Sequence, residues 1–288
     1  MNPAVSALAP TEVEVRLDRH HVLPGRVWCA ERPRATVAIV HGLGEHSGRY
    51  SALASELVQA RFTCVALDLP GHGDAPGPRG DLPSWEQVRD QFVPAMFTAP
   101  RGLPEQSATL PRVLLGHSMG GLLALDYALC HARDLSALVV SAPALRSEPP
   151  PWWKLALAHV ARAAAPGSAF PNGLSAAELS RDPQVVAAYE QDPLVHHRIS
   201  ARLYFSVLDA RARCMASARH LAVPTLMLQG MADRIVDPKG ALEFAGAAPH
   251  GMIRFVTLTD AYHEVFNDRG REAVIKDLIA WLDAALVV

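Results

Sequence analysis

The stretch RVLLGHSMGGLLALDYAL, residues 112–129, places a glycine-rich turn between an apolar run and a second apolar segment of helical length. Its centre, GHSMG (116–120), has a glycine two positions before and two positions after a serine. A serine on a sharp strand-to-helix turn has a strained backbone, and only glycine at those two positions avoids a clash. A turn without catalytic function is the alternative, but strand and helix flank the motif in the required order. We therefore predict that Ser118 is a nucleophile.

Short apolar runs bounded by Gly, Pro or Asp alternate with longer helical patterns along the chain. Runs that are apolar throughout and alternate with helices indicate a parallel sheet covered on both faces. The predicted strands are TVAIV (36–40), FTCVALD (62–68), RVLLG (112–116), ALVVSAP (137–143), TLMLQG (225–230) and MIRFVTL (252–258). The predicted helices lie near residues 49–60, 84–97, 119–132, 238–246 and 269–285. Before them, VEVRL (13–17) and GRVWCA (25–30) are predicted as two antiparallel edge strands.

The alternation is interrupted once, between residues 144 and 222. This segment has proline clusters, two adjacent tryptophans and short helical patterns, and we predict no strand in it. An insertion before the last two strands is typical of a helical cap, or lid. The predicted fold is therefore an α/β-hydrolase fold, with a core of residues 1–143 and 223–288 and a cap of residues 144–222.

One helix of the predicted cap, residues 152–165, is amphipathic. Lys154 and Arg162 lie on one side of it. Its apolar side comprises Trp152, Trp153, Ala156, Leu157 and Val160. Two interpretations stay open and are compatible: the apolar side packs on the body of the protein, or it roofs an acyl-binding tunnel and touches a membrane surface, where tryptophan favours the interface.

Composition excludes several classes of function. The 288 residues include 27 basic and 29 acidic ones, so a formal charge of −2 gives no reason to expect a nucleic-acid partner. The beginning of the chain lacks the basic start and apolar core of a signal peptide, and no uncharged apolar stretch approaches the roughly 20 residues of a membrane span. We expect a cytoplasmic protein, with peripheral contact at a membrane surface through the cap left open.

A serine nucleophile needs a base and an orienting acid, which in this fold follow it in the chain order acid, then histidine. Two aspartates follow the run TLMLQG. Asp237 precedes a proline and an apolar helical pattern, so a helix N-cap explains it, whereas no cap explains Asp233. We assign Asp233 as the acid. His263 alone among the histidines follows the last strand run, and we assign it as the general base.

The stretch HGLGEHSGRY, residues 41–50, follows the first buried run with three glycines and the charged residues Glu45 and Arg49. In this fold the second oxyanion donor comes from the loop at this position. We predict that the backbone N–H groups of Leu43 and Met119 form the oxyanion hole, with Gly42 and Gly44 allowing the loop to turn toward the nucleophile.

Four stretches together resemble the monoacylglycerol lipase and lysophospholipase branch of the α/β-hydrolases: HGLGEHSGRY, GHSMGG, QGMADRIVDPKG and AYHEVFND. The resemblance runs from about residue 26 to residue 283. GHSMGG is shared by many hydrolases, whereas the HGxGEHxxRY pattern is more specific to this branch. The resemblance implies that Ser118, Asp233 and His263 form the triad, that Leu43 and Met119 supply the oxyanion hole, and that no metal or other cofactor is required.

The resemblance also implies a glycerol-binding set at the polar end of the pocket, comprising Glu45, Arg49, His117 and Tyr189. For Glu45 and Arg49 an ion pair between residues i and i+4 at the start of a helix is the structural alternative. The sequence departs from the family at Ala75, where serine is usual, and at the proline-rich region 98–111. Either departure could alter the rim of the pocket.

The predicted function is a serine carboxylester hydrolase that cleaves monoacylglycerols through an acyl-enzyme. A lysophospholipase or a general short-chain esterase with the same triad is the nearest alternative. A non-catalytic binding protein is a remote one, because such proteins are expected to have a broken triad. A dehalogenase is disfavoured because it needs a carboxylate as its nucleophile.

Overall fold

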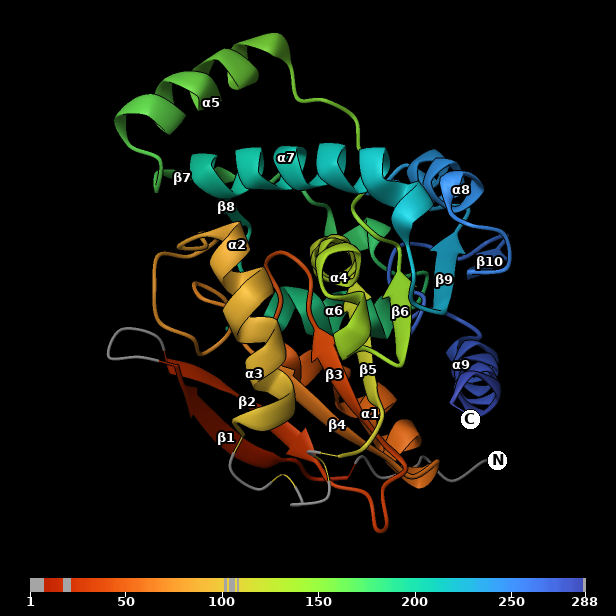
Figure 1. Ribbon diagram of the computed structural model, residues 1–288. Coiled ribbons are helices and arrows are strands. Elements are labelled where there is room, and N and C mark those ends of the chain that lie inside the picture. The colour runs from red at the N-terminus through yellow and green to blue at the C-terminus, as the bar shows by residue number, and fades with distance from the viewer. Residues whose placement is uncertain (1–7, 18–21, 101–102, 104–106, 108, 287–288) are drawn as a thin grey trace.

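The computed structural model describes residues 8–17, 22–100, 103, 107 and 109–286 of the chain. Eight strands form one sheet in the order β1-β2-β4-β3-β5-β6-β9-β10 (Figure 1). They are β1 (Thr11–Arg16), β2 (Val22–Trp28), β3 (Ala35–Val40), β4 (Phe62–Leu67), β5 (Arg112–His117), β6 (Ala137–Ser141), β9 (Thr225–Gly230) and β10 (Ile253–Leu258). Neighbouring strands from β4 to β10 are parallel, and β2 pairs antiparallel with both β1 and β4. The predicted parallel α/β sheet is confirmed, although of the two strands predicted as edge strands only β1 is an edge and β2 lies inside the sheet.

Helices cover both faces of the sheet because successive residues of its apolar strands point to opposite sides. In β3, Val37 and Ile39 join a core cluster with α1 (Ser51–Gln59) and α9 (Arg271–Ala285). Ala38 and Val40 join a second cluster with α3 (Val93–Thr98), α4 (Met119–Cys130) and α8 (Pro238–Ala247). The parallel strands thus direct their carboxyl ends toward one edge of the molecule, beneath the segment that joins β6 to β9.

The predicted helix at residues 84–97 is divided. It comprises α2 (Trp85–Gln87), a π-helical turn η2 (Val88–Phe92) and α3, which has Pro94 in its first turn. The Val93 N–H donates to the carbonyl of Val88, five residues back. Pro94 has no N–H to continue a regular helix, so the ladder of hydrogen bonds changes register here.

The segment between β6 and β9 contains mostly helices. Its elements are α5 (Trp152–Ala164), β7 (Ala169–Pro171), η5 (Ala176–Glu178), α6 (Pro183–Gln191), β8 (Arg198–Ser200) and α7 (Ala201–Ser217). The strands β7 and β8 pair antiparallel, so the prediction of no strand here is wrong. Three-residue strands show no periodicity that a sequence pattern could reveal. Short 3₁₀ turns elsewhere are η1 (Ser47–Tyr50), η4 (Ala132–Asp134) and η6 (Ala218–His220).

Within this segment α7 is tied to the core at both ends. Arg202 pairs with Asp81 near its start, and Arg213 pairs with Asp126 of α4 near its end. Helix α5 lies on the outer side of α7, away from the sheet (Figure 1).

Helix α5 has no buried residue. Trp152 is 81% exposed and Val160 is 65% exposed. The interpretation that the apolar side of this helix packs on the body of the protein is therefore wrong. In the described part of the chain, no helix has the length and hydropathy needed to cross a membrane.

Candidate active site

Ser118 occupies a strained turn between β5, which ends at His117, and α4, which begins at Met119. Its backbone has φ 54° and ψ −117°, a conformation that costs a non-glycine residue of order 1–3 kcal/mol. Close packing around the turn holds it there. A Cβ on Gly120 would lie 2.2 Å from the Val40 carbonyl oxygen, so only glycine fits where α4 crosses β3. The serine side chain is thereby presented at the carboxyl end of the sheet.

Three side chains from three separate loops form a continuous hydrogen-bonded chain. His263 Nε2 lies 2.9 Å from Ser118 Oγ, and His263 Nδ1 lies 2.7 Å from Asp233 Oδ2. The His263 and Asp233 side chains are 3% and 0% exposed. The residues predicted as nucleophile, base and acid thus meet, although 145 positions separate serine from histidine in the chain.

The second oxygen of Asp233 is held by backbone. Oδ1 accepts hydrogen bonds from the N–H groups of Ile235 (2.8 Å) and Val236 (3.0 Å). Burial opposes ionisation of Asp233, but the His263 imidazole and these hydrogen bonds outweigh it and lower the pKa of the carboxyl. Asp237 instead caps α8, accepting from the Lys239 N–H, as its sequence context predicts.

The loop after β3 passes directly beside Ser118. A Cβ on Gly42 would lie 3.3 Å from the Ser118 Cβ. Among the described residues, the backbone N–H groups of Leu43 and Met119 donate to no protein acceptor. Met119 N–H also lies at the N-terminus of α4, where the helix dipole favours negative charge.

A buried polar cluster fixes this loop. Glu45 Oε1 accepts hydrogen bonds from the Gly42 N–H (2.6 Å) and the Tyr50 hydroxyl (2.8 Å), and its Oε2 accepts from Arg49 Nη1 (2.9 Å). Arg49 also donates two hydrogen bonds to Glu264, at 2.6 and 2.8 Å. Burial opposes ionisation of Glu45, but the charge of Arg49 outweighs it and lowers the pKa of Glu45 to about 2. The i,i+4 ion pair exists, and it is part of a larger network.

The other two residues assigned to glycerol binding border the same cluster. The Tyr189 ring lies under the Arg49 guanidinium, with its centroid 4.7 Å away. The His117 ring centroid is 4.7 Å from that of His263, and its Nδ1 is 3.2 Å from the Ser141 hydroxyl. Burial lowers the pKa of His117 to about 4, so this imidazole is neutral at pH 7.

A small cavity of about 20 Å³ joins these groups. Its lining contains Ser118, His263 and the four residues assigned to glycerol binding, together with Gly42, Leu43, Leu174, Leu179 and Glu264. A larger apolar hollow of about 380 Å³ lies between α5, α7 and the β7–β8 pair. Asn172, which lines the hollow, lies close to the loop after β3, because its Nδ2 would lie 3.5 Å from a Cβ on Gly44.

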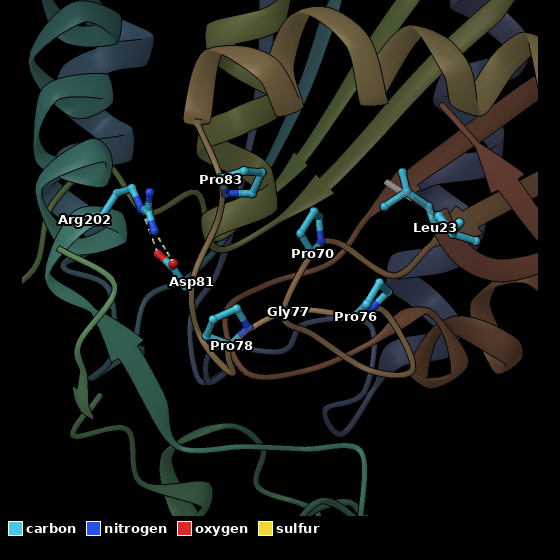
Figure 2. Close-up of a pocket in the computed structure, with 9 residues that line it drawn as sticks. Leu23, Pro70, Pro76, Gly77, Pro78, Asp81, Pro83 and Arg202 are labelled. Carbon is cyan, nitrogen blue, oxygen red and sulfur yellow. Dashed lines mark hydrogen bonds and ion pairs between the residues drawn. The ribbon is translucent and has the colours of Figure 1, made fainter. Parts of the chain in front are cut away.

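A third hollow, of about 320 Å³, is separate from the nucleophile. Four prolines line it, together with Leu23 and the Asp81–Arg202 ion pair (Figure 2). Ser118 and His263 are absent from its lining.

Neither sequence departure contributes a described residue to the lining of the small cavity. Ala75 is buried, and it does not line the small cavity. Of the irregular region 98–111, residues 101–102, 104–106 and 108 lie outside the described residues.

Three residues that line the small cavity were not predicted from the sequence as site residues: Glu264, Leu174 and Leu179. Glu264 directly follows His263 and was visible in the stretch AYHEVFND, but its partner Arg49 is 215 residues away. The two leucines come from the segment that covers the sheet, whose chain path no periodic pattern defines. Proximity to Ser118 is therefore what identifies all three.

The doubly covered parallel sheet, the strained serine between β5 and α4, and the late aspartate and histidine loops are those of an α/β-hydrolase. Residues 31–270 match the family described as "Serine aminopeptidase, S33". The chain belongs to this family and, within the α/β-hydrolases, to its monoacylglycerol lipase-like members, as its relatives indicate.

Two relatives and two solved structures illustrate the similarity. A monoacylglycerol lipase of Mycolicibacterium smegmatis is 33% identical over 89% of this chain and 91% of its own. The phospholipase YtpA of Bacillus subtilis is 32% identical over 89% of this chain and 98% of its own. The crystal structure of Paleococcus ferrophilus monoacylglycerol lipase has a TM-score of 0.82 and 35% identity, covering 91% of this chain and 99% of that one. A soluble variant of Saccharomyces cerevisiae monoglyceride lipase, with a substrate analogue, shares the fold at a TM-score of 0.86 and 22% identity, covering 99% of this chain and 98% of that one.

Proposed function

We propose that this lipid ester hydrolase cleaves monoacylglycerols to a fatty acid and glycerol through an acyl-enzyme on Ser118. The observation that carries the proposal is the single cavity that Ser118 and His263 share with the polar residues Glu45, Arg49 and Tyr189. Ser118 thus lies beside a polar space, and the same molecule has an apolar hollow between α5, α7 and the β7–β8 pair. This arrangement suits an ester of a polyol and a long apolar acid.

In the acylation step, His263 Nε2 takes the proton of Ser118 Oγ as the oxygen attacks the ester carbonyl carbon. Asp233 holds the imidazole in the tautomer that leaves Nε2 free to accept. The carbonyl oxygen becomes an oxyanion and accepts hydrogen bonds from the N–H groups of Leu43 and Met119. Removing one such donor costs about 3 kcal/mol of transition-state stabilisation in other hydrolases.

The tetrahedral intermediate then collapses. The bond from the carbonyl carbon to the glycerol oxygen breaks, and His263 gives its proton to that oxygen, so glycerol leaves. Water enters, His263 Nε2 takes one of its protons, and the hydroxide attacks the acyl-enzyme through the same oxyanion hole. Breakdown returns the proton to Ser118 and releases the fatty acid.

Glycerol binding is assigned to Glu45, Arg49, His117 and Tyr189. Glycerol hydroxyls are donors and acceptors, so carboxylate oxygens and the neutral His117 ring can both pair with them. The low exposure of Glu45 and Arg49, 5% and 10% for their side chains, supports this role because buried polar groups discriminate strongly between ligands.

The acyl chain is assigned to the 380 Å³ hollow, because the 20 Å³ cavity beside Ser118 is too small for a lipid chain. Trp153 and Leu157 of α5 form one wall of the hollow, and Phe170 and Tyr204 line it as well. In this proposal residues 144–222 act as the cap of the site, over a core of residues 1–143 and 223–288.

Lysophospholipid hydrolysis is a second candidate, supported by the similarity to the phospholipase YtpA. The test compares kcat/KM on 1-monoacylglycerol, lysophosphatidylcholine and p-nitrophenyl butyrate, the first two with the same acyl chain. We expect monoacylglycerol to be the best substrate. If it is the slowest of the three, the substrate assignment is wrong. Labelling of Ser118 by a fluorophosphonate probe separates either enzyme from a non-catalytic binding protein.

The proposal also includes contact between α5 and a membrane surface. Its support is the exposure of Trp152, Trp153 and Leu157 on one helix, the last two 53% and 50% exposed. We expect Trp152→Ser with Val160→Ser, two exposed residues of α5 that do not line the hollow, to reduce sedimentation with phosphatidylcholine vesicles several-fold while leaving p-nitrophenyl butyrate hydrolysis intact. Leu242→Ser, which changes an apolar residue of α8 that is 42% exposed, is the matched control. Equal vesicle binding by all three proteins would contradict the contact.

A further inference from the structure

Glu264 occupies the candidate site without a part in the proton transfers. It directly follows His263, and its side chain is 4% exposed. Its two carboxylate oxygens accept hydrogen bonds from Arg49, and Oε2 also accepts one from Asn267 Nδ2 at 3.0 Å. The carboxylate lines the small cavity beside Ser118.

Arg49 is the only arginine or lysine among the residues that line this cavity, and two carboxylates oppose it. Arg49 Nη1 donates one hydrogen bond to Glu45 and one to Glu264, and Nη2 donates a second hydrogen bond to Glu264. Two carboxylates and one guanidinium carry a formal charge of −1 together. The neighbouring His117 adds no positive charge at pH 7, because burial lowers its pKa to about 4.

This charge balance acts differently on different head groups. Glycerol is neutral and donates hydrogen bonds, so carboxylates are suitable partners for it. A phosphate-bearing head group would bring more negative charge into a buried region, where unit charges interact far more strongly than in water. Three of the five donor hydrogens of Arg49 already bond to carboxylates, which reduces its capacity to bind a phosphate.

We propose that Glu264 is a specificity-determining residue: with Glu45 it neutralises Arg49 and so excludes phosphate-bearing head groups from the leaving-group end of the site. This inference rests on the proposed function, because it assumes that a glycerol ester is the substrate. It assigns the choice between neutral and phosphorylated glycerolipids to one carboxylate.

Glu264 also has a bracing role, since its backbone N–H donates to the Leu179 carbonyl at 2.8 Å and connects the histidine loop to the covering segment. Glu264→Gln keeps this backbone contact, the side-chain shape and one carbonyl acceptor, and it removes the charge. Glu190→Gln makes the same change of net charge at an exposed position of α6 and is the control.

The test measures kcat/KM on 1-monoacylglycerol and on 1-acylglycerol 3-phosphate with the same acyl chain. We expect at least a tenfold preference for the neutral lipid in the unmodified protein. Glu264→Gln reduces this preference at least tenfold, mainly by lowering KM for the phosphate ester, and Glu190→Gln leaves it within twofold. A preference within twofold of the original in Glu264→Gln, with p-nitrophenyl butyrate hydrolysis retained, overturns the inference and leaves the proposed function standing.

A second measurement needs no variant and no lipid. Glycerol and glycerol 3-phosphate compete with p-nitrophenyl butyrate in the unmodified protein. The inference expects glycerol to inhibit at lower concentration, and stronger inhibition by glycerol 3-phosphate overturns it even if Glu264→Gln fails to fold. Failure of the proposed function has a different signature, since the protein would then hydrolyse p-nitrophenyl butyrate but neither glycerolipid.

Discussion

Arg49 donates two hydrogen bonds to Glu264, at 2.6 and 2.8 Å, across 215 positions of the chain. The pair connects the loop after β3, which carries Leu43, to the loop after β10, which carries His263. The same guanidinium pairs with Glu45, which holds the Gly42 N–H. The network therefore sets the position of the proposed oxyanion donor relative to the proposed base.

Replacing Arg49 by Met should destabilise the protein strongly. The change leaves Glu45 and Glu264 buried without their counter-charge, and breaking a buried ion pair in this way costs about 3–5 kcal/mol. Urea unfolding at pH 7 measures the effect. Arg254→Met, at an exposed position of β10, is the control and should cost less than about 0.5 kcal/mol. Similar losses in both variants would show that the network contributes little.

Gly44→Ala should lower the stability of the fold by more than the cost of the strained backbone conformation alone. Gly44 has φ +80°, and a Cβ there would lie 2.4 Å from the His196 carbonyl oxygen. Gly173 has φ +79° with no atom within 4 Å of an added Cβ, so Gly173→Ala isolates the strain, which is about 1–2 kcal/mol. The difference between the unfolding temperatures of the two variants measures the effect of the clash with the His196 carbonyl oxygen. The Gly44 variant should also lose ester hydrolysis, since this loop borders Ser118; equal behaviour of the two variants would contradict the close packing.

The parallel sheet and its helices could be predicted because their signals are local. TVAIV is buried on both sides and reads as an apolar run, and Asp237 caps a helix within its own neighbourhood. The contact between Ser118, Asp233 and His263 could be anticipated from chain order in a known type of fold. The Arg49–Glu264 pair could not, because it depends on how two distant loops meet. The exposure of Trp152 could not either, since an amphipathic pattern does not show which side faces solvent.

Asp233→Asn should lower kcat strongly, whereas Asp237→Asn should leave kcat unchanged. Asp233 accepts from His263 Nδ1 at 2.7 Å, and loss of its charge allows the wrong imidazole tautomer, for which a fall in kcat of about 10⁴-fold is known in a serine protease. Asp237 caps α8, and asparagine is also a good cap, so its variant should change stability by less than about 1 kcal/mol and leave kcat unaltered. Steady-state kinetics on p-nitrophenyl butyrate distinguishes them. A larger loss of kcat in Asp237→Asn would reverse the assignment of the acid.

Acidification from pH 7 to pH 5 should destabilise the fold through its buried histidines. Burial lowers the pKa of His72 well below its ordinary value and that of His196 to about 4, with the Arg79 charge acting in the same direction. Unfolding restores a pKa of about 6.5, so below that pH the unfolded chain binds more protons and stability falls. The loss is up to about 1.4 kcal/mol per pH unit for each such histidine.

Urea unfolding between pH 7 and pH 5 checks this prediction. His196→Gln removes one of the titrating groups and should give a shallower loss of stability over that range. The slope should not vanish, because burial also lowers the pKa of His41 and His72. An unchanged slope in the variant would contradict the role of His196.

The most direct test of the central claim is the rate of monoacylglycerol hydrolysis by Ser118→Ala. The variant removes the oxygen that lies 2.9 Å from His263 Nε2 and leaves the rest of the cavity in place. Loss of a serine nucleophile in a triad lowers kcat by about 10⁴-fold to 10⁶-fold, so we expect no turnover above background and an unchanged unfolding temperature. Hydrolysis by folded Ser118→Ala at the rate of the unmodified protein would contradict the proposed mechanism.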